Sequence, residues 1–192
     1  MITDINQLDL NKSYSYADYV TWQFEEMVEI IKGKIFKMSP APSTKHQDVS
    51  ISLTRELSIF LKKKPCKLFA APFDVRFIKN SEDKTITTVT QPDLCVICDL
   101  AKIDERGCIG APDFIIEILS PATRSKDIHE KFDLYEEFGV LEYWIVDPAG
   151  QILDKFVLEN DKYQLKGKYT LGDKVTVHTL PGLEIDLDEI FE

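Results

Sequence analysis

The sequence predicts an α/β fold in which a mixed β-sheet is flanked by helices. Apolar residues recur at helical spacing over residues 44–63. Three β-rich runs follow, at about 67–78, 85–90 and 93–98. A strand, a helix and a second strand then succeed one another over residues 113–146, and a unit of this length implies a parallel pair joined by a right-handed crossover. The order helix, three strands, helix, strand is typical of the α/β class.

Size and composition predict one domain over residues 1–192. The chain is 44% hydrophobic, which suffices for a sizeable core, and it contains no Gly/Pro-rich linker. No apolar run approaches the roughly 20 residues of a membrane helix. The N-terminus lacks the basic-then-apolar pattern of a signal peptide. We therefore expect a soluble, cytoplasmic protein without a membrane partner.

Residues 13–24 of the N-terminal half predict a short helix, in which Ser15 precedes an apolar-periodic run. Residues 28–38 read as a hairpin, because two β-rich runs flank Lys32-Gly33 and glycine adopts the positive φ of such a turn. The next helix carries a regular apolar stripe and is stopped by proline; the residues concerned are Val49, Leu53, Leu57, Phe60 and Pro65.

The C-terminal half contains the predicted crossover. A strand from Asp113 to Leu119 is followed by Ser120–Thr123, which caps a helix running to Phe138, and Gly139 ends that helix. Residues 141–146 form the aromatic and β-branched second strand. The remaining chain predicts a peripheral hairpin near residues 151–168.

Net charge argues against nonspecific nucleic-acid binding as a default. Lys and Arg number 23 and Asp and Glu number 33, a net charge of −10, which repels nucleic acid at long range. One basic patch, Lys62–Lys64 with Lys67, could act locally, since charges are screened beyond about 8 Å in physiological salt. A solvated helix end is the favoured interpretation of this patch.

The four cysteines are expected to be reduced thiols in a cytosolic chain. Cys95 and Cys98 have the spacing of a zinc or redox pair. In a strand, however, residues three apart point to opposite faces, so these thiols do not converge on one ion. We interpret them as small buried apolar residues.

Two carboxylates stand out within buried strands. Glu117 interrupts a continuous apolar run that predicts a strand covered on both faces. A carboxylate buried there needs a cation, a proton or a metal beside it. Asp93 opens the preceding strand, and two carboxylates from neighbouring strands suit a hard cation such as Mg²⁺ or Mn²⁺. The structural alternatives are a buried salt bridge for Glu117 and an ordinary turn aspartate for Asp93.

Lys131 completes the candidate site. On a helical wheel it falls within the stripe of Ile128, Phe132, Tyr135 and Phe138, on the sheet-facing side of the helix that follows Glu117. The alternative is an i, i+4 pair with Asp127 or an ammonium in water. Asp93 and Glu117 as metal ligands, with Lys131 beside the reacting water, have the composition of a metal-dependent phosphodiester hydrolase. P-loop, GxSxG and HExxH motifs are absent from the sequence.

The chain resembles the Uma-two family, which is assigned to the restriction-endonuclease-like PD-(D/E)XK superfamily. The resemblance covers most of residues 25–150. It is carried by Glu29–Gly33, Met38–Pro40, His46, Pro92-Asp93, Gly110–Asp113, Glu117–Pro121, Thr123-Arg124, Asp127, Lys131, Tyr135, Gly139-Val140 and Glu142–Pro148.

The resemblance implies a restriction-endonuclease-like core (α-β-β-β-α-β), extended by the N-terminal hairpin and by C-terminal β structure. It implies Asp93 and Glu117 as the motif acids. The superfamily lysine normally lies two residues after the second acid, where this chain has Leu119, and the family pattern moves that role to Lys131. The leading hypothesis is a homodimeric, Mg²⁺-dependent endonuclease acting on DNA. The alternative is a non-catalytic nucleic-acid-binding or protein-interaction module that keeps the fold.

Three further residues are weaker candidates for the site. Glu29 matches the family pattern, although a hairpin glutamate is usually exposed. His46 and Glu56 lie near the apolar stripe of the first long helix, where a capping or core-edge role is expected rather than catalysis.

Overall fold

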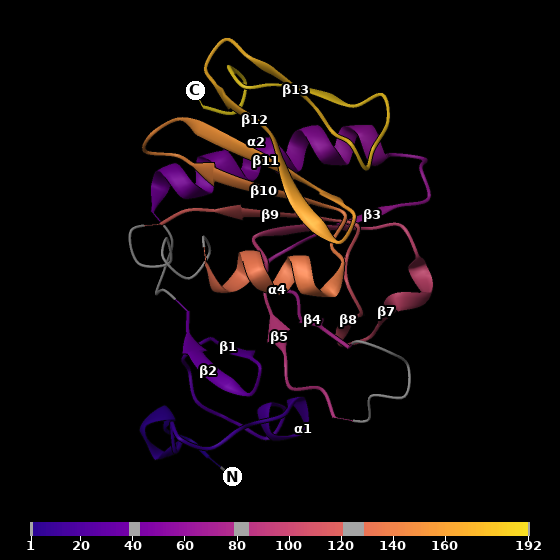
Figure 1. Ribbon diagram of the computed structural model, residues 1–192. Coiled ribbons are helices and arrows are strands. Elements are labelled where there is room, and N and C mark those ends of the chain that lie inside the picture. Colours follow the sequence, from indigo (N-terminus) through magenta and orange to yellow (C-terminus); the bar gives the residue numbers. More distant parts are fainter. Residues whose placement is uncertain (1, 39–42, 79–84, 121–128, 192) are drawn as a thin grey trace.

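The computed structural model describes residues 2–38, 43–78, 85–120 and 129–191. Within them, two six-stranded mixed sheets lie on either side of one helix, and a second helix covers the outer face of one sheet (Figure 1). This arrangement confirms the predicted α/β class and adds a second large sheet that the sequence did not predict.

The central sheet has the strand order β12-β11-β10-β9-β6-β3. All its neighbours are antiparallel except β9 and β10, so the predicted parallel pair is confirmed. Its strands are β3 (Lys67–Ala70), β6 (Leu94–Ile97), β9 (Phe114–Ile118), β10 (Glu142–Asp147), β11 (Ile152–Glu159) and β12 (Lys162–Thr170).

The second sheet has the order β2-β1-β5-β4-β8-β7. Its first two strands form the predicted hairpin, and Lys32 and Gly33 both have positive φ in the turn. Gly33 has φ 79°, a conformation that strains other residues, and a Cβ there would also press on the Ser13 side chain. The strands are β1 (Val28–Ile31), β2 (Lys34–Lys37), β4 (Val75–Arg76), β5 (Val89–Thr90), β7 (Ile103–Asp104) and β8 (Gly107–Ile109).

Short helices precede the main elements. The predicted helix over 13–24 is reduced to α1 (Tyr16–Tyr19), with Ser15 and Asp18 forming a capping box. Two 3₁₀ turns, η1 (Ile5–Gln7) and η2 (Leu100–Lys102), complete the short elements.

The two longer helices cover opposite faces of the central sheet. Helix α2 (Thr44–Leu61) buries Val49, Leu53 and Leu57 of its predicted stripe, while Phe60 is partly buried. Helix α4 (Glu130–Phe138) ends at Gly139, which is left-handed with φ 80°. The predicted start of this helix and its Asp127 and Ile128 lie in residues 121–128, outside the described part of the chain.

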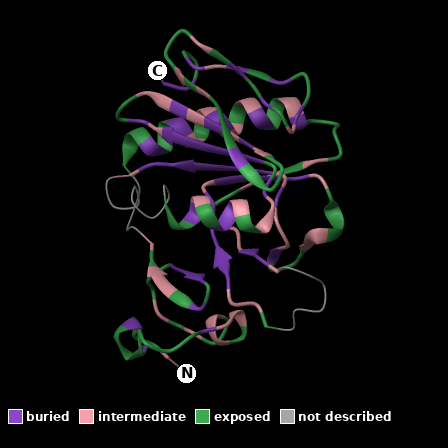
Figure 2. Ribbon diagram, in the orientation of Figure 1, coloured by how far each residue is buried: buried purple, intermediate pink, exposed green. Residues whose placement is uncertain are grey.

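Strand alternation divides the interior into two cores. Phe114, Ile116 and Ile118 of β9 pack with α2, whereas Ile115 and Leu119 pack with α4 and the second sheet. Buried residues run the length of the central strands (Figure 2). Side chains of alternate β9 residues, including Glu117, are therefore held between the sheet and α4.

The hairpin predicted near residues 151–168 is formed by β11 and β12, which lie at one edge of the central sheet. Strand β11 pairs with β10 over six residues, so the hairpin widens the central sheet. Two further strands, β13 (Lys174–Thr176) and β14 (Glu184–Asp186), form the C-terminal β extension. Their Val175 and Ile185 belong to the α2-side core.

The expectation of four reduced thiols is wrong for Cys66 and Cys98, which form a disulfide. Lys67 pairs with Ile97 in the β3–β6 ladder, so the next residues outward, Cys66 and Cys98, lie opposite each other. Cys95 and Cys108 are free, as expected, and both are buried. Cys98, which was also expected to be buried, is only partly buried. The described helices include none long and apolar enough to cross a membrane.

Candidate active site

Glu117 lies in the middle of the crossover unit and faces α4. Its residue is only 2% exposed, because β9 is covered on both faces. Glu117 Oε1 lies 2.7 Å from Lys131 Nζ and accepts a hydrogen bond from the Tyr135 hydroxyl, also at 2.7 Å. The buried carboxylate therefore has the cation that its burial demands.

Lys131 extends from the first turn of α4 into the space between the two sheets. It is 3% exposed, which confirms that it faces the sheet and reaches Glu117. Its Nζ also lies 3.0 Å from Glu29 Oε1. One ammonium is thus shared by two carboxylates, from β9 of the central sheet and β1 of the second.

Glu29 corrects the expectation of an exposed hairpin glutamate. The side chain is fully buried, because β1 is covered on both sides between β2 and β5 and by the neighbouring layers. Its Oε1 accepts a hydrogen bond of 3.0 Å from the backbone N–H of Gln91. Glu29 therefore joins the Glu117–Lys131 pair, and the three residues are called the α4-side cluster below.

Asp93 lies beside this cluster rather than within it. The ladder pair Leu94–Ile116 places Asp93 opposite Glu117, one residue before β6 begins. Asp93 Oδ2 accepts a hydrogen bond of 2.7 Å from the backbone N–H of Ile118. Its Oδ1 lies 3.3 Å from His46 Nε2 at the start of α2. The two acids thus come from adjacent strands, but Lys131 contacts Glu117 and Glu29.

His46 combines two roles. Its backbone N–H donates to the Ser43 N-cap, as a capping position requires, and its buried ring contacts Asp93. Glu56, in contrast, lies on the side of α2 where it pairs with Arg55 at 3.0 Å. Lys62–Lys64 are exposed, as expected of a solvated helix end. Lys64 Nζ lies 4.1 Å from the centroid of the Phe60 ring.

Tyr135 is a component that the sequence reasoning placed on the core stripe without assigning it to the site. It lies one helical turn after Lys131, so both reach Glu117. Its hydroxyl also lies 3.3 Å from Thr90 Oγ1. Burial first, and then the negative charge of Glu117, raise the pKa of the phenol well above 10.0. Tyr135 is therefore a permanent hydrogen-bond donor at neutral pH.

The carboxylates and histidine of the site determine which metal ion it could hold. Among the described residues, no three or more His, Cys, Asp or Glu side chains are arranged to hold one. A zinc-type cage of protein ligands is thus not found in this part of the chain. Mg²⁺ differs, because one or two carboxylates with waters and substrate phosphates suffice. Asp93 and Glu117 are two carboxylates on adjacent strands, the kind of donor that such a site uses.

Comparison with known proteins assigns the chain to a family. Residues 16–188 match the model of the Uma2 family, described as "Putative restriction endonuclease". The chain belongs to the Uma2 family. The matched stretch includes the α4-side cluster, Asp93 and His46.

Two relatives extend the comparison. An uncharacterized protein of Synechocystis, slr1290, is 25% identical over 180 residues, covering 92% of this chain and 90% of that protein. A crystal structure from Anabaena variabilis, titled as a putative nuclease belonging to DUF820, superposes with a TM-score of 0.72. It is 20% identical and covers 93% of this chain and 97% of its own, a likeness that shows the shared fold.

Proposed function

We propose that the protein is a Mg²⁺-dependent endonuclease that hydrolyses DNA phosphodiester bonds, working as a homodimer in the cytoplasm. The observation that carries the proposal is that Asp93 and Glu117 lie opposite each other on adjacent strands, with Lys131 Nζ 2.7 Å from Glu117. Family membership supports a nuclease-like activity on nucleic acid. DNA as the substrate, the metal and the dimer are the further steps of this proposal.

Each side chain has a chemical task in this scheme. Asp93 and Glu117 would hold Mg²⁺, with waters in the remaining positions. The bound ion would polarise a phosphate oxygen and lower the pKa of a coordinated water. Lys131 would orient that water and offset negative charge that grows at phosphorus. Tyr135 fixes the Glu117 carboxylate by donating to Oε1, and Glu29 restrains the ammonium.

The competing function is a non-catalytic module for binding nucleic acid or protein. One observation favours it: Lys131 is already ion-paired with two glutamates, as a structural salt bridge would be. Titration calorimetry with Mg²⁺ alone separates the two functions. Millimolar or tighter binding that Glu117→Gln removes supports the nuclease, whereas no binding supports the module.

The activity test uses purified full-length protein and supercoiled DNA with Mg²⁺ or Mn²⁺. We expect cutting by the wild type and none by Glu117→Gln or Lys131→Ala. Glu56→Gln is the matched control, because its carboxylate pairs with Arg55 outside the α4-side cluster. Wild-type rates in both site variants would refute the proposal.

A further inference from the structure

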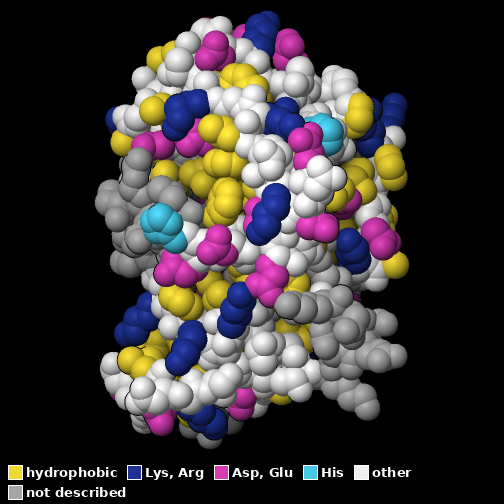
Figure 3. All heavy atoms as spheres, in the orientation of Figure 1, with side chains coloured by type: hydrophobic (Ala, Val, Ile, Leu, Met, Phe, Trp, Pro, Cys, Tyr) yellow, Lys and Arg dark blue, Asp and Glu magenta, His cyan; other side chains and the backbone are white. Residues whose placement is uncertain are grey.

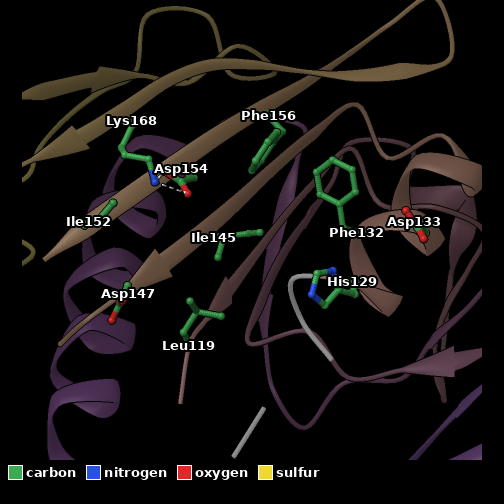
Figure 4. Close-up of a pocket in the computed structure, with 10 residues that line it drawn as sticks. All are labelled: Leu119, His129, Phe132, Asp133, Ile145, Asp147, Ile152, Asp154, Phe156 and Lys168. Carbon is green, nitrogen blue, oxygen red and sulfur yellow. Dashed lines mark hydrogen bonds and ion pairs between the residues drawn. The ribbon is translucent and has the colours of Figure 1, made fainter. Parts of the chain in front are cut away.

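A pocket of about 440 Å³ opens on the α4 side of the central sheet. Its sheet side is formed by Leu119, Ile145 and Phe156, and its helix side by His129 and Phe132. Figure 4 shows the two sets facing each other across the opening. Hydrophobic side chains gather at the centre of this face of the molecule, with charged side chains around them (Figure 3).

The pocket is close enough to the α4-side cluster to share a substrate with it. Ile145 is the ladder partner of Glu117 on β10. Leu119 lies two residues beyond Glu117 on the same face, which is roughly 6.6 Å along the strand. That distance corresponds to about two steps of a stacked nucleic-acid strand at about 3.4 Å each.

Aromatic rings give the pocket flat apolar surfaces. Phe132 and Phe156 meet at 83° with ring centroids 5.0 Å apart, and both are only partly buried. A nucleobase stacked on such a ring gains about 5-fold to about 100-fold in affinity. Purines present the larger π-face and gain more from the same contact.

Charged groups lie at the rim of the pocket. Among the described residues these are Asp133, Asp147, Asp154 and Lys168. Lys168 Nζ lies 2.8 Å from Asp154 and its side chain is 59% exposed. A neutral base offers donors to a carboxylate and acceptors to an ammonium, so such a rim can bind its polar edge.

We propose that this pocket binds an unpaired purine base of the nucleic-acid substrate, near the phosphate that is cut. The assignment rests on the proposed function for its substrate, and it extends that function by naming the part of the substrate that is bound. A base inside a duplex is paired and stacked on both faces. It must therefore leave the stack, or come from a single strand, to enter.

The direct test follows the methyl NMR signals of Leu119, Ile145 and Ile152 in the full-length protein without metal. Adenosine is expected to shift them, and uridine to bind at least about 3-fold more weakly, because stacking strength follows ring area. No shift with adenosine, equal binding of uridine, or an equal response to inorganic phosphate would each overturn the assignment.

Substitutions then locate the binding. Phe156→Leu should weaken adenosine at least about 5-fold by removing a stacking ring, whereas Phe156→Tyr should retain binding. Lys168→Ala should weaken binding as well, and Lys166→Ala is its matched control, since both lysines lie on β12 and pair with a β11 carboxylate. Unchanged binding in both Phe156→Leu and Lys168→Ala would refute the pocket as the base site.

The outcomes for pocket and nuclease are separable. Adenosine binding at these methyl groups without DNA cutting would keep the pocket and remove the proposed function. DNA cutting at wild-type rates and with unchanged base preference in Phe156→Leu would keep the nuclease and remove the pocket.

Discussion

Two buried acid–lysine clusters lie on opposite faces of the central sheet, and they are built differently. On the α2 side, Glu142 Oε1 accepts from Trp144 Nε1 at 2.9 Å, and Oε2 accepts from the backbone and hydroxyl of Thr179 at 2.8 and 2.9 Å. Lys155 is 3.8 Å away and donates to the Thr176 carbonyl. On the α4 side, two carboxylates share Lys131.

Under the proposed function, this difference separates a structural role from a chemical one. Glu142 and Lys155 balance each other's charge. Glu142 also accepts hydrogen bonds from Trp144 on its own strand and from two groups of Thr179 in the C-terminal extension. Among the described residues, the α4-side cluster sets one lysine between two acids, and Asp93 lies on the strand next to Glu117. Under the proposed function, Asp93 and Glu117 supply the oxygen donors that a hard cation prefers.

Activity should separate the clusters most strongly. Glu117→Gln is expected to lower the Mg²⁺-dependent cutting rate at least about 100-fold, because a ligand and its charge are lost. Glu142→Gln should leave the rate per folded molecule unchanged. Initial rates on supercoiled DNA, normalised to folded protein by circular dichroism, measure both. Equal losses of cutting rate in Glu117→Gln and Glu142→Gln would show that the two clusters do not differ in function.

Loss of Lys131 or of Lys155 should destabilise the fold. We expect Mg²⁺ to restore stability only where Lys131 is lost. Lys131→Met and Lys155→Met each remove the ammonium that pairs with a buried carboxylate, at an expected cost of about 3–5 kcal/mol. Mg²⁺ should restore part of this in Lys131→Met, where a cation can take the place between two acids. Urea denaturation with and without Mg²⁺ is the measurement. Equal recovery of Lys155→Met would contradict the account.

Removing one acid should cost less on the α4 side. In Glu29→Gln, Lys131 keeps Glu117 and the amide oxygen can still accept from Gln91, so about 1 kcal/mol is expected. Glu142→Gln turns an amide N–H₂ toward fixed donors and should cost about 3 kcal/mol. Urea midpoints for the two variants provide the comparison, and a larger loss in Glu29→Gln would reverse it.

Of the two clusters, only the α4-side one should lose stability at alkaline pH. We expect this effect to be the smallest of the four predicted here. Tyr135 stays protonated when folded, because burial raises its pKa well above 10.0. In the unfolded chain the Tyr135 phenol releases its proton near pH 10. The stability that Tyr135 contributes is therefore complete below that pH and is lost as the pH rises above it. Tyr135→Phe should lack this decline, at most about 1.4 kcal/mol per pH unit. The measurement is the free energy of unfolding from urea denaturation between pH 8 and pH 11, in the wild type and in Tyr135→Phe. The same slope against pH in both proteins would contradict the prediction.

The sequence predicted the local part of this site. Lys131 lies on the sheet-facing stripe of an amphipathic helix, and Glu117 interrupts an apolar strand, so periodicity alone placed both. The parallel β9–β10 pair followed from the length of the crossover. These features depend on residues near one another in the chain.

The missed features depend on contacts between distant segments. Glu29 is buried because the second sheet packs against α4, and nothing within the hairpin encodes that packing. Cys66 and Cys98 pair across a separation of 32 residues through the β3–β6 register. Tyr135 gave the one usable signal, since a polar hydroxyl one turn after Lys131 lies on the same stripe.

Anomalous diffraction from crystals soaked in Mn²⁺ tests the site most directly. The account predicts one manganese peak bridging the Asp93 and Glu117 carboxylates at about 2.0–2.3 Å, with Lys131 beside it and the peak lost in Glu117→Gln. Crystals that bind no manganese there, with Lys131 still held between Glu29 and Glu117, would show that this cluster is only a structural salt bridge.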